Sequence, residues 1–542
     1  MSDMTLTGAL ADGPSPRPHL DEKPHFAGAV MFLLVLAAGL GYAAFSISRD
    51  MGVAGEQTLA IGAFVLLGIA LLIALAFEFV NGFHDTANAV ATVIYTHSLP
   101  PLAAVIWSGS FNFLGVLTSS GAVAYSVVTL LPVELILQVG SGAGYAMIFA
   151  LLIAAIIWNL GTWAMGLPNS SSHALIGSIM GVGIANQLLA PAGVATSGVD
   201  WGQAAGVLRA LLFSPLIGFV LSWLLLLGMK VVVRSKSMYV APEGKKPPPA
   251  AIRGLLVLTC TGVSFFHGSN DGQKGMGLIM LILIGAAPTA YALNRAMPAD
   301  STPAFLQTVQ AAQNVFTAHA GGNAPPADIP AARATVGKAL QTKTVNTPEA
   351  YAALATLTGD IGQQVKTYGA IKQVPAAATA NVRNDMYLAS DAVRLMGASP
   401  AGFDATDVGK LKTLSSALNS GTRFIPIWVK VSVALALGLG TMVGWKRIVV
   451  TVGEKIGNTH LTYAQGASAE IVAMATIGLA DGFGLPVSTT HVLSSGVAGT
   501  MLANGSGLQL STLKNMALAW ILTLPAAMII AGSLYVLLRQ VF

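Results

Sequence analysis

Long apolar runs with very few charges constrain this chain more than any other feature of its sequence. Between Phe26 and Lys230 only nine of 205 residues are charged. A membrane-spanning helix needs about 20 predominantly apolar residues, and runs of that order recur along the chain. Over all 542 residues 9% are charged, against about 25% in an ordinary soluble protein. The sequence therefore predicts an all-α polytopic membrane protein and excludes an ordinary soluble enzyme, a disordered chain and a nucleic-acid-binding protein.

Shifts in composition divide the chain into membrane and polar segments. Residues 230–253 hold six Lys or Arg and one acid, which predicts a cytoplasmic loop by the positive-inside rule. Residues 290–425 hold 11 basic and eight acidic residues and no long apolar run. One membrane crossing separates the two, so this polar helical domain is expected outside the cytoplasm. The predicted segments are 1–58, a polar tail and an extra N-terminal transmembrane helix; 59–229, a first transmembrane repeat; 230–253, the basic cytoplasmic loop; 254–289, the start of a second transmembrane repeat; 290–425, the inserted extracytoplasmic helical domain; and 426–542, the remainder of the second repeat.

Two short motifs each occur twice. The first runs from Asn81 to Ala89 and again from His267 to Gly275, and the second is a Leu-Pro-x-Ser-Ser/Thr-Ser/Thr-His sequence at 167–173 and 485–491. The aspartates of the first motif are 186 residues apart, and the central residues of the second motif are 318 apart. The difference of 132 is close to the length of the polar insertion. Such spacing predicts a duplicated transmembrane unit with one domain inserted in the second copy.

The first motif places carboxylates and amides inside apolar sequence. Asp85 and Asp271 are the carboxylates most deeply framed by apolar residues, with Asn81 and Asn270 beside them. A carboxylate inside a membrane needs a cation, a proton or a basic partner. Neighbouring glycines allow the helix to unwind and leave backbone groups for an ion. We therefore expect these residues to couple transport to a cation, and the alternative is a hydrogen bond between helices.

The second motif predicts helices that begin inside the membrane. Proline starts a helix well, and Ser and Thr suit its N-terminal cap. The free N–H groups and the positive dipole end of such a helix bind oxyanions, and hydroxyls add further donors. The alternative is an ordinary helix contact, where Ser and Thr are common. The candidate substrate-binding residues in these triplets are Ser170, Ser171, Ser172, Ser488, Thr489 and Thr490.

Several other polar residues are weaker candidates. His173 and His491 follow the triplets, and a structural or proton-handling role suits them better than catalysis, because no Gly-x-Ser-x-Gly sequence surrounds either serine. Lys274 occurs in the second copy only, where it either meets the anion or pairs with Asp271 three residues earlier. Glu78 and Glu470 lie in apolar runs and are additional candidates for coupling.

Taken together, the paired motifs resemble those of the inorganic phosphate transporter (PiT) family. Asn81 to Ala89 and His267 to Gly275 are similar to its Gly-Ala-Asn-Asp-Val-Ala-Asn-Ala signature, and the Gln-Lys-Gly at 273–275 is similar to its bacterial low-affinity members. The resemblance covers the chain from about residue 59. It implies inverted-topology repeats with re-entrant helical hairpins and broken helices. It also implies uptake of phosphate driven by a cation gradient, with phosphate held by the hairpin serines and threonines and with Asn88 and Gln273 helping to place it.

The resemblance further implies a coupling ion and a location, and two alternative functions stay open. Bacterial members of this type are similar in using protons, often with phosphate as a neutral complex with Mg²⁺ or another divalent metal. Gln273 and Lys274 depart from the signature, and an ammonium near the site disfavours a bound monovalent cation such as Na⁺. The sequence leaves H⁺ or Na⁺ as the coupling ion. We expect a bacterial cytoplasmic membrane protein surrounded by lipid, with no covalent cofactor and no certain resident metal, and the sequence leaves monomer and homodimer open. The rivals are a transporter of another oxyanion such as sulfate and an intramembrane enzyme acting on phosphorylated lipid.

Overall fold

The computed structural model describes most of the chain. The described residues are 18, 20, 26–55, 61–85, 87–137, 139–191, 196, 198–242, 244, 246–398 and 402–542. They fold into helices and loops, with no β-strand among them. The α-helices are α1 (Phe26–Ala54), α2 (Ile61–Asp85), α3 (Ala87–Tyr95), α4 (Pro101–Thr118), α5 (Ala122–Val128), α6 (Val133–Leu137), α7 (Gly142–Ala164), α8 (Ser171–Leu188), α9 (Trp201–Val232), α10 (Ala250–Ala286), α11 (Pro288–Tyr291), α12 (Thr302–His319), α13 (Ile329–Thr342), α14 (Pro348–Tyr368), α15 (Ala376–Ala398), α16 (Ala405–Thr422), α17 (Ile427–Thr441), α18 (Lys446–Val450), α19 (Tyr463–Gly482), α20 (Thr489–Asn504) and α21 (Leu510–Leu538).

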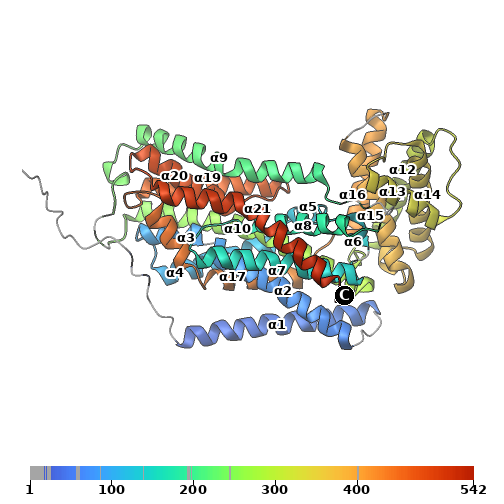
Figure 1. Ribbon diagram of the computed structural model, residues 1–542, viewed down its shortest axis with the longest axis horizontal. Helices are drawn as coiled ribbons and strands as arrows, with labels where there is room; N and C mark the ends of the chain where they lie inside the picture. The colour runs from blue at the N-terminus through green and yellow to red at the C-terminus, as the bar shows by residue number, and fades with distance from the viewer. Residues whose placement is uncertain are drawn as a thin grey trace, which may run out of the picture.

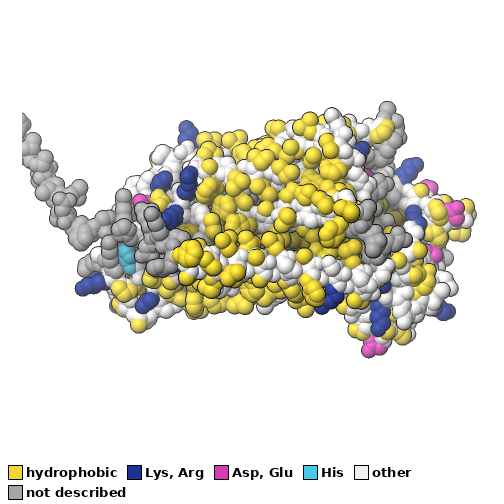
Figure 2. All heavy atoms as spheres, turned by 90° about the horizontal axis from the view of Figure 1, so that it is seen from below, with side chains coloured by type: hydrophobic (Ala, Val, Ile, Leu, Met, Phe, Trp, Pro, Cys, Tyr) yellow, Lys and Arg dark blue, Asp and Glu magenta, His cyan; other side chains and the backbone are white. Residues whose placement is uncertain are grey.

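The long apolar helices form one elongated bundle. In the described part of the chain seven helices are long and apolar enough to cross a membrane, or eight if the bent pair α16 and α17 counts as one span. Apolar side chains cover the middle of the face shown in Figure 2, and Lys and Arg side chains lie toward the two ends. This distribution is the one expected of a bundle whose middle faces lipid.

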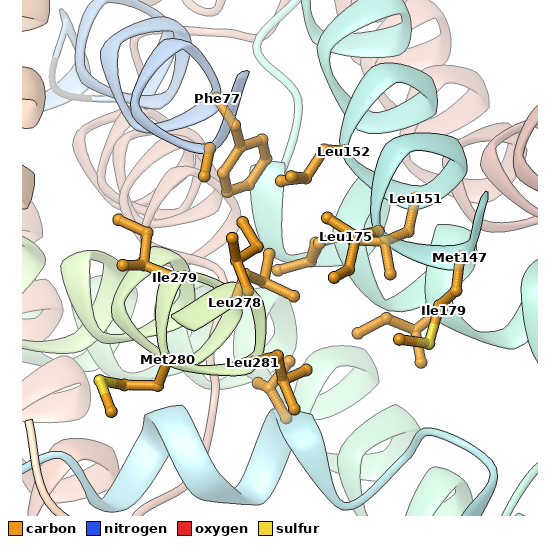
Figure 3. Close-up of a cluster of buried hydrophobic side chains, with 14 of the residues drawn as sticks. Phe77, Met147, Leu151, Leu152, Leu175, Ile179, Leu278, Ile279, Met280 and Leu281 are labelled. Carbon is orange, nitrogen blue, oxygen red and sulfur yellow. The ribbon is translucent and has the colours of Figure 1, made fainter. Parts of the chain in front are cut away.

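Apolar side chains from both halves of the sequence fill part of the bundle interior. Phe77 of α2, Leu151 of α7, Leu175 of α8 and Leu278 of α10 are at most 1% exposed and gather in one cluster (Figure 3). Because α10 belongs to the second copy of the duplicated unit, the two copies share a core. They do not form separate domains side by side.

Matched glycines bring helices of the two copies into close contact. A Cβ added at Gly82 of α2 would lie 2.2 Å from the carbonyl oxygen of Leu437 on α17. At the equivalent Gly268 of α10 it would lie 2.2 Å from the carbonyl oxygen of Asn112 on α4. Each copy thus packs a glycine of its first motif against a helix of the other copy.

The second copy of the first motif lies on a continuous helix, because α10 is helical throughout from Ala250 to Ala286. In the first copy, α2 ends at Asp85 and α3 begins at Ala87, and Thr86 between them lies outside the described residues. The unwinding expected at the first motif is therefore wrong for its second copy, on α10. Its glycines serve close approach instead, because Gly268 lies against α4 where a side chain would collide with backbone.

Two equivalent helices run in opposite directions through the bundle. The hydroxyl of Tyr291, just after α10, donates to Asp50 near the end of α1 over 3.2 Å. The end of α1 and the end of α10 therefore lie at the same end of the bundle, and α2 starts beside the end of α1 (Figure 1). The N-terminus of α2 and the C-terminus of α10 therefore lie at this same end of the bundle.

Helices α12–α16 form a polar bundle at that same end (Figure 1). Its apolar side chains make a core of their own, and the side chains of Thr347 and Asp404 cap the N-termini of α14 and α16. Arg394 of α15 contacts Asp200, the cap of α9, over 3.0 Å. A helix of 32 residues spans about 48 Å, so the basic loop that follows α9 lies at the opposite end of the bundle.

Candidate functional site

The two Ser/Thr triplets form the N-termini of α8 and α20. Ser170 caps α8 by accepting from the backbone N–H of His173 over 3.2 Å, and Ser488 caps α20 by accepting from the N–H of His491 over 3.1 Å. Proline precedes each cap by two residues. Both helices start in buried surroundings, because every residue of both triplets is at most 5% exposed.

These two helix N-termini meet inside the bundle. The hydroxyl of Ser172 donates to the carbonyl oxygen of Val487, just before the other triplet, over 3.0 Å. The rings of His173 and His491 lie 4.5 Å apart, centroid to centroid. The hydroxyls of Ser171 and Thr489 are buried and make no hydrogen bond within the described part of the chain. Two positive dipole ends and two available donors therefore converge on one place, as a bound oxyanion requires.

Asp85 lies at this junction, at the end of α2. One of its carboxylate oxygens accepts from the hydroxyl of Thr490 over 3.0 Å and contacts Nδ1 of His84 over the same distance. The other ring nitrogen of His84 lies 3.2 Å from the hydroxyl of Thr162 on α7. The carboxylate is thus tied directly to the triplet of α20, from the opposite copy.

Asp271 lies on the other side of the same junction. The ammonium of Lys274 donates to its carboxylate over 2.6 Å and to the hydroxyl of Ser172 over 2.5 Å. His267 Nε2 lies 3.5 Å from the second carboxylate oxygen. Of the two roles that the sequence leaves open for Lys274, the structure has the pairing with Asp271, and the same ammonium also reaches the triplet of α8.

The two aspartates and one histidine come close enough to share a cation. The ligand atoms of Asp85, His267 and Asp271 all lie within 4.8 Å of one another, and all three side chains are buried. Carboxylate oxygens and an imidazole nitrogen suit several divalent metals, whereas Mg²⁺ prefers oxygen alone. The ammonium of Lys274 competes for Asp271, so the geometry fits a transient cation better than a tightly held structural metal.

Other candidates from the first motif hold the framework. Asn270 donates to the carbonyl oxygen of Leu485 over 3.0 Å and so braces the loop before α20. Asn81 donates to Glu78 over 3.4 Å on α2. Gln273 faces away from the junction, where it donates to Asp481 over 2.7 Å and accepts from the N–H of Val123 over 2.9 Å.

Two more candidates lie apart from the junction or outside the described side chains. Glu470 of α19 accepts hydrogen bonds from the hydroxyls of Thr92 and Thr259. Neither of these partners belongs to a triplet. The side chain of Asn88 lies outside the described residues.

Sequence reasoning missed several polar residues that support the site. Asp481 of α19 accepts from Ser269 over 2.6 Å as well as from Gln273, and Asn112 lies 2.8 Å from the ring of His267. Asp481 could have been identified from the sequence, because it is a carboxylate near an apolar run and lies five residues before Pro486 of the second motif. Asn112 carries none, because isolated asparagines in apolar helices are not specific to any function.

Helix N-termini that converge on buried carboxylates inside an apolar bundle are typical of membrane transporters. Residues 81–531 match the family described as "Phosphate transporter family". The chain is 42% identical to the low-affinity inorganic phosphate transporter PitA of Escherichia coli K12, over 87% of this chain and 97% of that protein. It is 39% identical to PitB of the same organism, over 88% and 98%. A solved structure titled "The sodium-dependent phosphate transporter" covers 88% of this chain and all of that chain, with 19% identity and a TM-score of 0.48.

The chain belongs to the phosphate transporter family. It is therefore a transporter and not an enzyme, which removes the intramembrane lipid enzyme from consideration. The family and the long apolar helices also support the predicted multi-pass location in the bacterial cytoplasmic membrane.

Proposed function

We propose that this protein imports phosphate by symport with a cation, and that the cation is a proton. The observation that carries the proposal is the junction itself: the N-termini of α8 and α20 meet, the triplet of α20 contacts Asp85 directly, and the triplet of α8 is linked to Asp271 through the ammonium of Lys274. An anion site and a cation site that share side chains cannot be filled independently. Sharing side chains between the phosphate site and the cation site is what obligatory coupling of the two fluxes requires.

Phosphate carries one to two negative charges near neutral pH and is costly to bury alone. Each helix N-terminus contributes about half a positive charge. The buried hydroxyls of Ser171 and Thr489 are available to replace water around the phosphate oxygens. We infer that phosphate binds between these two triplets.

Asp85 supplies the coupling. Two like unit charges about 5 Å apart repel by about 3 kcal/mol at an effective dielectric constant of about 20. An ionised Asp85 therefore disfavours phosphate in the same junction, and a proton on its carboxyl group removes the repulsion. The side chains of Thr490 and His84 hold this carboxyl group in place in either state.

A divalent metal that travels with phosphate is a variant of the same mechanism. Asp85, His267 and Asp271 would then contact the metal of the cargo. Because Lys274 already pairs with Asp271, we favour the proton as the coupling ion and treat the metal–phosphate complex as one form of the substrate.

The movement we propose is a rocking of two inverted repeats around the junction. The opposite directions of α2 and α10 support this arrangement (Figure 1), as do the matched contacts of Gly82 and Gly268 with the other copy. Each repeat, with its own triplet and aspartate, would turn against the other and so expose the junction first to one side of the membrane and then to the other.

The experiment that tests this function is uptake of labelled phosphate into proteoliposomes under imposed gradients. We expect an inward proton gradient to drive accumulation and a sodium gradient to have little effect. Addition of Mg²⁺ tests the metal–phosphate form, and excess sulfate tests selectivity. Equal accumulation with and without any cation gradient would contradict symport, and full competition by sulfate would favour the other oxyanion.

A further inference from the structure

The second repeat contains a cation that the first repeat lacks. With the spacing of 186 residues between the two copies of the first motif, Asp271 corresponds to Asp85 and Lys274 corresponds to Asn88. The duplicated unit therefore has an amide in one copy where the other has an ammonium. The contacts of that ammonium show what the substitution does.

Lys274 is committed to its own repeat's aspartate. It lies one helical turn after Asp271 on the unbroken helix α10, and both side chains are fully buried. A buried charge is tolerated when it is paired and hydrogen-bonded, and it is very costly otherwise. The ion pair of 2.6 Å between Lys274 Nζ and one carboxylate oxygen of Asp271 pairs both charges without any ion from solution. The other carboxylate oxygen is buried and makes no hydrogen bond within the described part of the chain.

The same ammonium reaches across to the anion site. It donates to the hydroxyl of Ser172, in the triplet that begins α8. Lys274 thus touches the carboxylate that would bind a cation and one residue of the triplets between which phosphate would bind. The contacts of Asp85 described above include His84 and Thr490, two side chains that carry no permanent positive charge.

We propose that Lys274 is a built-in cation of the second repeat, so that the transporter loads only one exchangeable cation, at Asp85, for each phosphate. This inference rests on the proposed symport. In a fully symmetric pair of repeats both aspartates would need a cation before the anion could bind. Here the protein supplies one of the two permanently, and the gradient supplies the other.

The test is the dependence of initial phosphate uptake on the coupling cation, at a constant concentration of the transported form of phosphate. For wild type we expect a Hill coefficient of about 1, since the coefficient cannot exceed the number of linked sites. Lys274→Asn places in the second repeat the residue that the first repeat has at the equivalent position, Asn88. We expect uptake to fall about tenfold or more at low cation concentration because Asp271 is left unpaired, and the coefficient to rise toward about 2.

Two further variants keep the test decisive. Asp271→Asn combined with Lys274→Asn replaces the ion pair by two neutral amides, and we expect its coefficient to return to about 1. Lys430→Asn removes an ammonium on α17 that donates to the carbonyl oxygen of Ser119, outside the junction, and should leave the coefficient unchanged. The amount and thermal stability of each purified variant show whether it has folded.

The outcomes separate the inference from the function on which it rests. A wild type that already shows a coefficient of about 2, or a Lys274→Asn variant with the wild-type coefficient, would overturn the built-in cation and leave symport intact. A wild type that accumulates no phosphate under any cation gradient would overturn the proposed symport, and the inference with it.

Discussion

The two buried aspartates have equivalent places in the sequence and different surroundings. Asp85 contacts a histidine and a threonine hydroxyl, whereas Asp271 is paired with the ammonium of Lys274. On our proposal, the first repeat binds the exchangeable cation at Asp85, and the second repeat holds a permanent charge at Lys274.

Replacement of Asp85 should have the largest effect on transport of all the changes that distinguish the two aspartates. Asp85→Asn removes the group whose charge we expect to oppose phosphate by about 3 kcal/mol, equivalent to about 100-fold in rate. We expect proton-driven accumulation to be lost by about that factor, while exchange of phosphate between the two sides of the membrane persists. Uptake driven by a proton gradient and phosphate exchange without a gradient are the two measurements.

Asp481→Asn is the matched control for this prediction. Asp481 is an acidic side chain that contacts Ser269 and Gln273 instead of the triplets. Its loss should lower the rate through the framework and leave the cation dependence as it is. Wild-type proton dependence in Asp85→Asn would show that the coupling group lies elsewhere.

Removal of a triplet hydroxyl near each aspartate tests the same difference between Asp85 and Asp271, and we expect a smaller effect on transport. Thr490→Ala removes the donor to Asp85, and Ser172→Ala removes the partner of Lys274. Hydrogen bonds to charged groups contribute about 1.5–3 kcal/mol, so each change should cost about 10-fold to 100-fold in kcat/KM. We expect Thr490→Ala to shift the cation dependence and Ser172→Ala to raise the KM for phosphate.

The conservative variant Thr490→Ser keeps the hydroxyl and should restore most of the loss. If Thr490→Ala and Ser172→Ala altered the cation dependence equally, both repeats would load an exchangeable cation, and the asymmetry between Asp85 and Asp271 would have no functional meaning.

Much of this site could be predicted from the sequence, because its residues occur in two motifs with consistent spacing. Prolines and hydroxyl residues locate the helix N-termini at Ser171 and Thr489, and each aspartate lies in the other motif. The meeting of the two motifs could only be inferred from the duplication. It depends on contacts between helices that are far apart in the chain.

The different contacts of Gln273 and Lys274 have a simple geometric cause. An α-helix turns by about 100° per residue, so Gln273 points to nearly the opposite side of α10 from Asp271, and Lys274 points to nearly the same side. Gln273 accordingly contacts Asp481, and Lys274 contacts Asp271. Treating the motif as a helix would have ranked Lys274 above Gln273, but it could not have revealed Ser172 as the second partner.

Matched glycines test whether the two repeats are also equivalent in packing. A Cβ at Gly181 of α8 would lie 2.2 Å from the carbonyl oxygen of Met528, and at Gly499 of α20 it would lie 2.2 Å from that of Phe219. Overpacking costs about 1–3 kcal/mol. We expect Gly181→Ala and Gly499→Ala to lower the thermal stability of the purified protein by similar amounts, and Gly161→Ala, where no atom of the described chain lies within 4 Å, to have no such effect.

The smallest expected effect comes from the contact between the inserted bundle and the first repeat. Arg394 of α15 contacts Asp200 over 3.0 Å and Asp391 over 2.6 Å, with its side chain 31% exposed. Partly exposed ion pairs of this kind contribute about 0–1 kcal/mol. Arg394→Ala should therefore change thermal stability slightly, with a difference that shrinks in high salt, and should leave phosphate uptake within about twofold of wild type.

This last variant separates two explanations of the asymmetry, because the insertion, like Lys274, occurs in only one repeat. If Lys274 is the cause, Arg394→Ala must leave the Hill coefficient for the cation unchanged, and Arg394→Lys must behave in the same way. A changed coefficient in Arg394→Ala would instead mean that docking of α12–α16 on α9 sets the coupling. The functional difference between Asp85 and Asp271 would then originate outside the membrane bundle.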